Sequence, residues 1–241
     1  MKTSKKNMFV LITLMGVFLI LITGCSSTFQ TRKVTTSGFL GDYSQLEKGS
    51  GDEAQLRYIN PQANFGGYTK ILMDPVKFYS DKNSKLEGKD KKRIVDYLDA
   101  TIKEQLKTDY TFVNKPSSET MRLRVAITEA KGSKVVMDTI SSVIPVGIAL
   151  GLVKKVATGT NLSVGKASIE LEIQDSQTGE RLAAAVDERA GRKYTGKFDK
   201  FDKYSTVEDA FDYWAKKLKK RLAYFWRLSD KHIFEHNLNN Y

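Results

Sequence analysis

Cysteine and histidine are almost missing from this 241-residue chain. The single cysteine, Cys25, excludes an internal disulfide and any cysteine-clustered zinc or iron–sulfur site. The two histidines, His232 and His236, lie in the last ten residues, where a surface pair is the favoured interpretation. We therefore expect no metal site, no cofactor and no histidine-based catalysis in the body of the fold.

The chain also lacks an apolar run long enough to cross a bilayer, which takes roughly 20 residues. Residues 8–23 form an uncharged run of 16 residues behind Lys2, Lys5 and Lys6. A positive start followed by a short apolar stretch is typical of a secretory signal peptide. The alternative, an ordinary secretory signal with a chance cysteine nearby, is disfavoured because the next four residues also fit a lipoprotein signal.

Ile22, Thr23 and Gly24 precede Cys25 in the pattern that the lipoprotein signal peptidase accepts. The sequence thus predicts a signal peptide over 1–24, cleavage before Cys25 and acylation of its thiol. Two or three acyl chains anchor a protein stably, whereas one does so only marginally. Removal of the segment takes away three lysines and lowers the net charge from +11 to +8. In a two-membrane cell, Ser26 favours the periplasmic face of the outer membrane.

The rest of the chain is expected to form one domain. Residues 25–36 are polar and non-periodic and predict a tether, residues 37–228 the domain, and residues 229–241 a polar tail. Residues 37–46 mix turn formers with large apolar side chains and predict an extended arm lying on the domain.

Hydrophobic periodicity predicts the remaining elements. Helices are expected over 90–107 and from 205 to about 225, the second after a capping-box pattern. Strands are expected over 69–79, with an interruption at Pro75, and over 110–113, 121–128, 167–174 and 182–186. A turn with Gly179 joins the last two. This order predicts an α/β (α+β) fold, a two-layer sandwich of a mostly antiparallel sheet with two amphipathic helices.

No constellation of catalytic residues emerges, and we expect no enzyme activity. Glu170 and Glu172 share one face of a strand, and paired carboxylates can perform acid–base chemistry. Because Ser168 and Gln174 lie on the same face, a solvated outer surface is favoured instead. No serine or cysteine nucleophile has a plausible base nearby.

Five cations lie close together on the last helix: Lys216, Lys217, Lys219, Lys220 and Arg221. A solvated helix face is the simpler interpretation. The alternative is contact with anionic lipid head groups or a cell-wall component, which would reinforce the membrane anchor. Nucleic acid is not an expected partner, because no nucleic-acid-binding motif accompanies the charge.

Residues 135–153 are largely apolar, and the last ten of them, 144–153, carry no charge. A short helix or hairpin packed across the sheet is the favoured interpretation. An exposed flap that enters a membrane or meets a partner subunit is the alternative.

Several motifs together carry a family resemblance: the Cys25 box, Ser37-Gly38-Phe39-Leu40, Asp74-Pro75-Val76 and the stretch from Asp175 to Asp187. With these, the chain resembles the bacterial lipoproteins of domain-of-unknown-function family 3313, from about Ser37 to Leu222. The resemblance implies a Gram-negative envelope lipoprotein and no established activity. We expect a non-enzymatic binding or assembly module with an unknown envelope protein as partner. The alternatives are an oligomeric membrane-inserting secretion subunit and a hydrolase of envelope polymers.

Overall fold

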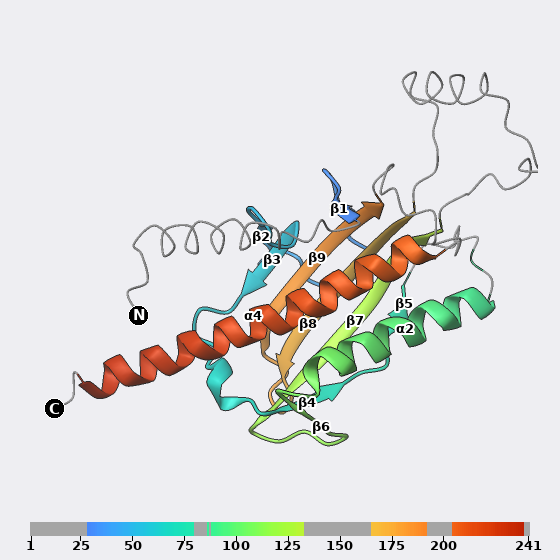
Figure 1. Ribbon diagram of the computed structural model, residues 1–241. Coiled ribbons are helices and arrows are strands. Elements are labelled where there is room, and N and C mark those ends of the chain that lie inside the picture. Colours follow the sequence, from blue (N-terminus) through green and yellow to red (C-terminus); the bar gives the residue numbers. More distant parts are fainter. Residues whose placement is uncertain (1–27, 80–85, 87, 133–164, 192–203, 239–241) are drawn as a thin grey trace, which may run out of the picture.

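The computed structural model describes residues 28–79, 86, 88–132, 165–191 and 204–238, with side chains described through Ser229 on the last helix. The predicted signal peptide, Cys25 and residues 135–153 lie outside the described part. Within it, two long helices lie on one face of a twisted sheet (Figure 1). The predicted two-layer α+β sandwich is confirmed.

Three long antiparallel strands form the middle of the sheet: β7 (Thr120–Lys131), β8 (Lys166–Asp175) and β9 (Arg181–Gly191). The alternation of apolar residues predicted all three strands, although β7 and β9 are several residues longer than predicted. The turn between β8 and β9 places Gly179 at φ +73°, a backbone conformation that glycine adopts without steric cost.

Shorter strands extend the sheet on both sides. On the β9 side, β1 (Thr28–Gln30) and β3 (Leu56–Ile59) pair with β9, and β2 (Glu47–Lys48) pairs with β3, all antiparallel. On the other side, β4 (Lys70–Met73) and β5 (Lys77–Phe78) lie parallel to β7, with β6 (Thr111–Phe112) parallel to β4. The interruption predicted at Pro75 separates β4 from β5. A 3-10 turn, η2 (Phe65–Gly67), connects β3 to β4.

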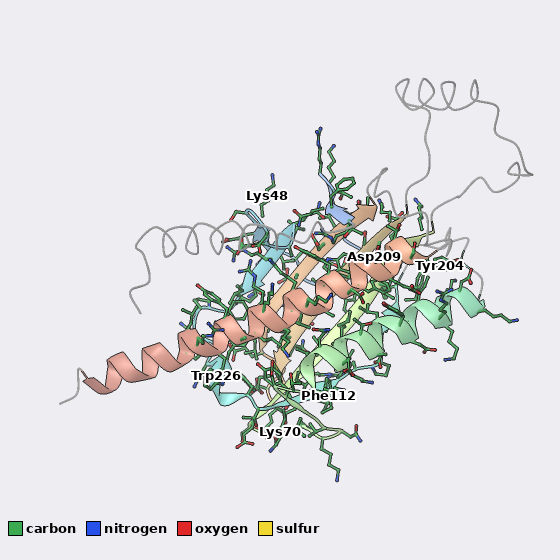
Figure 2. The ribbon with its side chains drawn as sticks, viewed as in Figure 1. Lys48, Lys70, Phe112, Tyr204, Asp209 and Trp226 are labelled. Atoms are coloured by element: carbon green, nitrogen blue, oxygen red, sulfur yellow. The ribbon has the colours of Figure 1, made fainter. Side chains whose placement is uncertain are left out.

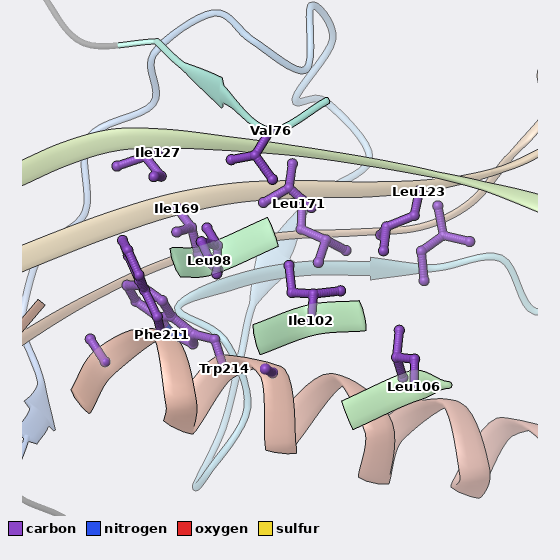
Figure 3. Close-up of a cluster of buried hydrophobic side chains, with 14 of the residues drawn as sticks. Val76, Leu98, Ile102, Leu106, Leu123, Ile127, Ile169, Leu171, Phe211 and Trp214 are labelled. Atoms are coloured by element: carbon purple, nitrogen blue, oxygen red, sulfur yellow. The ribbon is translucent and has the colours of Figure 1, made fainter. Parts of the chain in front are cut away.

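The main core lies between the sheet and the helices α2 (Gly88–Leu106) and α4 (Ser205–Leu238). The stripe predicted on α2 is buried as expected, at Ile94, Leu98, Ile102 and Leu106. Phe211 and Trp214 of α4 pack with α2 over the apolar faces of β7 and β8 (Figure 3). The burial of these stripes, more than helix propensity, stabilises both helices.

The opposite face of the sheet is covered as well. Phe39 and Leu40 of the predicted arm are buried against Ala126, Ala184 and Val186. The arm therefore lies on the sheet as expected. It makes a second, smaller hydrophobic cluster that covers part of this face of the central strands.

Both ends of the described chain differ from the prediction. β1 falls inside the segment predicted as a tether, because its backbone groups pair with the end of β9. The residues predicted as a polar tail from 229 continue α4 to Leu238. No proline or glycine occurs between Ser205 and Leu238, so nothing local stops the helix where its apolar stripe ends.

A helix of 34 residues is about 50 Å long, whereas a strand of 10 residues such as β8 is about 33 Å long. The C-terminal part of α4 accordingly projects beyond the long strands (Figure 1).

Candidate functional site

The two glutamates predicted to face solvent are instead buried. Glu170 is 0% exposed and Glu172 is 2% exposed. The prediction was wrong because alternation along β8 shows which residues share a face but not what covers that face. Here the arm covers it: Glu170 accepts hydrogen bonds from the Ser37 backbone N–H at 2.5 Å and from the Tyr43 hydroxyl at 2.6 Å.

Glu172 lies between two arginines, Arg124 and Arg181. Arg181 donates to Glu172 Oε1 at 2.6 Å and also to the backbone carbonyls of Leu40 and Asp42. Its guanidinium therefore joins a buried carboxylate to the arm, and a guanidinium is suited to such a role because its donors are fixed in a fork. Arg124 also lies over the ring of Phe39, 5.0 Å from its centroid. Glu170 and Glu172 therefore hold the arm in place, and the carboxylate of each is bonded to two partners from the protein.

A buried carboxylate that the sequence did not reveal lies on the helix-facing side of β9. Asp187 is 4% exposed and accepts a 2.7 Å hydrogen bond from the indole Nε1 of Trp214. Gln30 and the backbone N–H of Gln55 donate to its other oxygen. Burial raises the pKa of Asp187 above its ordinary value, partly offset by these hydrogen bonds. Asp187 therefore connects β9 to α4, β1 and the segment before β3.

The five predicted cations do not form one surface. Lys217 and Arg221 pair with Asp52, and Lys219 lies 3.4 Å from Asp109. Lys216 and Lys220, four residues apart on α4, are exposed. The helical repeat explains the split, because residues four apart share a face whereas neighbouring residues do not. The prediction of an anionic-surface contact stays open, and the structure presents Lys216 and Lys220 for it.

Asp52 and Glu53, in the loop between β2 and β3, meet the buried side of this basic cluster. The hydrogen bond from Lys217 holds the pKa of Asp52 below its ordinary value. Glu53 accepts a 2.7 Å bond from Arg57 and lies 3.9 Å from Arg221. Three cations and two carboxylates thus gather where the loop approaches α4.

Large apolar side chains are exposed toward the C-terminal part of α4. Tyr224 is 53% exposed, Trp226 is 44% exposed and Leu228 is 39% exposed. Figure 2 places Trp226 on this part of the helix, away from Tyr204 at its start. Tyr224 and Leu228, four residues apart, share one face of the projecting helix, whereas Trp226 lies on the other side of the buried Phe225. Exposed apolar side chains that share a face are typical of a contact surface. Sequence reasoning missed it because it treated this stretch as the end of a buried stripe.

The predicted lipidation residue Cys25 and its box Ile22, Thr23 and Gly24 lie outside the described residues, and His232 and His236 lie on α4 where only the backbone is described. Across the described ranges, no group of three or more metal-ligating side chains comes together. Likewise, no helix in this part of the chain has the length and apolarity needed to cross a bilayer.

A family model described as "Protein of unknown function (DUF3313)" matches residues 35–218. The chain belongs to the DUF3313 family. The family resemblance found from the sequence motifs is therefore confirmed. The matched residues begin just before the arm and end within α4, so the family pattern includes the arm, strands β2 to β9, α2 and the first part of α4.

Comparison with curated proteins finds no match for this DUF3313 protein. Solved structures offer distant likenesses. Protein XCC0632 from Xanthomonas campestris is 10% identical, with 72% of this chain and 93% of that chain covered and a TM-score of 0.42. A PelC dodecamer from Paraburkholderia phytofirmans is 11% identical, with 68% and 94% covered and a TM-score of 0.37. A minor lipoprotein from Acinetobacter baumannii is 9% identical, with 68% and 95% covered and a TM-score of 0.30.

Proposed function

We propose that this DUF3313 protein is a lipid-anchored protein of the bacterial cell envelope whose domain acts as a binding module and not as an enzyme. The observation that carries the proposal is the position of the only cysteine, Cys25, directly after a signal-like segment. The paired strand β1 begins at Thr28, three residues later, so acylation at Cys25 would hold the domain close to the membrane surface.

The buried carboxylates support the binding role over a catalytic one. Catalytic acids need access to substrate, whereas Glu170 and Glu172 are covered by the arm and bonded to it. The exposed Tyr224 and Leu228, which share one face of α4, supply a surface for an envelope protein. The neighbouring Lys216 and Lys220 suit an anionic lipid or cell-wall polymer.

Fractionation of cells that express the full chain tests the anchor. We expect the Cys25→Ser protein to leave the membrane fraction, because no thiol remains to carry acyl chains. The matched control is Ser26→Asp, which keeps Cys25 and should remain in the membrane fraction but move from the outer to the inner membrane. A Cys25→Ser protein that still sediments with the outer membrane would overturn the proposal.

The binding role is tested by crosslinking in intact cells. A photoreactive residue at Tyr224, which is 53% exposed and shares the face of Lys216 and Lys220, should give a discrete crosslinked product. The same residue at Lys92, which is exposed on α2, serves as the control. Equal crosslinking from both positions, or none from Tyr224, would contradict a binding role for α4.

A further inference from the structure

A cavity of about 130 Å³ lies between the sheet and the two helices. Its lining is largely aliphatic and aromatic and includes Leu98, Ile102, Ile169, Leu171, Trp214 and Phe225. The space exists because β9 contributes Ala183 and Ala185 where β8 contributes isoleucine and leucine. Long side chains on one strand fill the space under a helix, whereas short side chains on the neighbouring strand leave that space empty.

The cavity reaches the surface where charged side chains line it. Arg57, Lys217 and Arg221 lie there together with Glu53, and their side chains are between 17% and 34% exposed. Cations outnumber the carboxylate in this part of the lining. An apolar interior with a cationic opening is complementary to a molecule with an alkyl chain and an anionic head group.

Asp187 also lines the cavity but does not offer a second place for a head group. Its two oxygens accept hydrogen bonds from Trp214, Gln30 and the backbone of Gln55. The polar contacts of an incoming ligand therefore belong at the opening.

We infer that this cavity binds a medium-chain fatty acid, with the alkyl chain between α4 and β9 and the carboxylate against Lys217 and Arg221. Asp52 occupies the carboxylate position in the structure, since it pairs with both Lys217 and Arg221 from a side chain that is 74% exposed. A ligand carboxylate can replace this exposed loop carboxylate at little cost, because the ion pairs that the ligand forms are similar to those that Asp52 gives up. This site is independent of the anchor at Cys25.

The size of the cavity sets the chain length. An engineered protein cavity of about 150 Å³ holds benzene, so about 130 Å³ accepts roughly six carbon atoms. Affinity should rise about fourfold with each methylene, from a transfer free energy of about 0.8 kcal/mol, until the space is filled. It should level off between hexanoate and octanoate, which have five and seven carbons beyond the carboxylate, whereas adsorption to an apolar surface would continue to strengthen with every added carbon.

Titration with sodium butanoate, hexanoate, octanoate and decanoate, below their micellar concentrations, tests the inference. The protein is residues 26–241, which keep every described residue, with folding verified by circular dichroism and a cooperative melt. Trp226→Phe leaves Trp214 as the one tryptophan, so its emission reports the cavity. We expect a saturable change in emission, a rise in melting temperature with octanoate and a chain-length plateau.

Three variants separate the parts of the inference. Ala185→Leu fills the cavity and should weaken octanoate binding at least tenfold, while Ala223→Leu, which adds the same side chain outside the cavity lining, should not. Asp52→Asn removes the competing carboxylate and should tighten binding severalfold. Arg221→Gln should weaken octanoate binding.

The inference is overturned if octanoate changes neither Trp214 emission nor melting temperature, or if octylammonium binds as tightly as octanoate. It is also overturned if folded Ala185→Leu binds as well as Ala223→Leu. Should Ala185→Leu not fold, the chain-length plateau and the Asp52→Asn comparison in the otherwise unchanged protein decide the question. A negative result in these binding experiments does not contradict the proposed membrane anchor, because the anchor is tested separately by fractionation.

Discussion

Trp214 and Asp187 form a 2.7 Å hydrogen bond that joins the first third of α4 to β9 across the core. The carboxylate also accepts from Gln30 and Gln55, so four separate segments of the chain meet at one buried acid. Buried polar groups of this kind are costly unless every partner is present, and here each oxygen has one.

The raised pKa of Asp187 predicts a specific pH dependence. A raised pKa means that the carboxyl group binds its proton more tightly in the folded protein than in the unfolded chain. Protonation of the group therefore stabilises the folded protein. Its contribution to stability therefore declines as the pH rises from the ordinary value of 3.8 through the raised folded value. Asp187→Asn cannot ionise and lacks this decline.

Urea unfolding of the wild type and of Asp187→Asn at pH 4 and pH 7 measures this effect. We expect the stability of the wild type relative to the variant to be smaller at pH 7 than at pH 4. Other carboxyl groups cancel in the comparison, including Asp52, whose pKa is lowered. If the stability of the wild type relative to the variant is instead larger at pH 7 than at pH 4, the pKa of Asp187 is lowered and not raised.

Removing Arg181 should release the arm. Arg181→Gln leaves Glu172, which is 2% exposed, with one arginine partner in place of two and removes the bonds to Leu40 and Asp42. Breaking a buried ion pair costs about 3–5 kcal/mol. The matched control is Arg122→Gln, which breaks the pair with Asp74 from a 46% exposed side chain and should cost less than about 1 kcal/mol.

Urea unfolding and limited proteolysis between residues 34 and 46 measure the two effects. If Arg181→Gln and Arg122→Gln lose equal stability, the buried network does not hold the arm.

Tyr43 holds the same arm through its hydroxyl group, which donates to Glu170 and accepts from the backbone N–H groups of Gly38 and Leu40. Tyr43→Phe leaves a buried carboxylate oxygen without this donor and should cost about 1–3 kcal/mol. Amide hydrogen exchange at Gly38 and Leu40 should accelerate in the variant. Unchanged exchange at both amides would mean that apolar contacts alone keep the arm on the sheet.

Two glycines allow the start of α4 to approach the sheet. A Cβ on Gly191 would lie 2.9 Å from Thr206 Cγ2, and one on Gly165 would lie 2.7 Å from Thr206 Cβ. Either alanine substitution should cost about 1–3 kcal/mol through overpacking. Thr206→Ala removes Cγ2 and should rescue Gly191→Ala, where the nearest remaining Thr206 atom is 3.6 Å away, but should not rescue Gly165→Ala.

Double-mutant cycles in urea measure this difference. Equal rescue at both glycines would indicate that the start of α4 moves freely enough to relieve either contact.

Much of the architecture could be predicted because its signals are local. The four-residue repeat of Ile94, Leu98, Ile102 and Leu106 identifies α2 without reference to other elements. The alternation in β7 and β8 does the same for the central strands. The end of α4 could not be placed in this way, since a helix without a breaking residue can continue past its last core contact.

The candidate site was harder to predict because it depends on contacts between distant segments. Glu170 and Glu172 have the sequence pattern of a solvated face. Glu170 is instead covered by Ser37 and Tyr43, more than 120 residues away, and Glu172 is held by Arg124 and Arg181. The split of the basic cluster likewise depends on Asp52 in a distant loop.

From the sequence alone came the α+β class, the DUF3313 family, the two amphipathic helices and the lone Cys25 behind a signal-like segment, because periodicity, motifs and composition belong to short stretches of chain. The tertiary structure decided which carboxylates are buried, which cations are paired and where alanines of β9 leave a cavity under α4. Burial and ion pairing are properties of surfaces brought together by folding, and no single segment specifies the surface that will cover it.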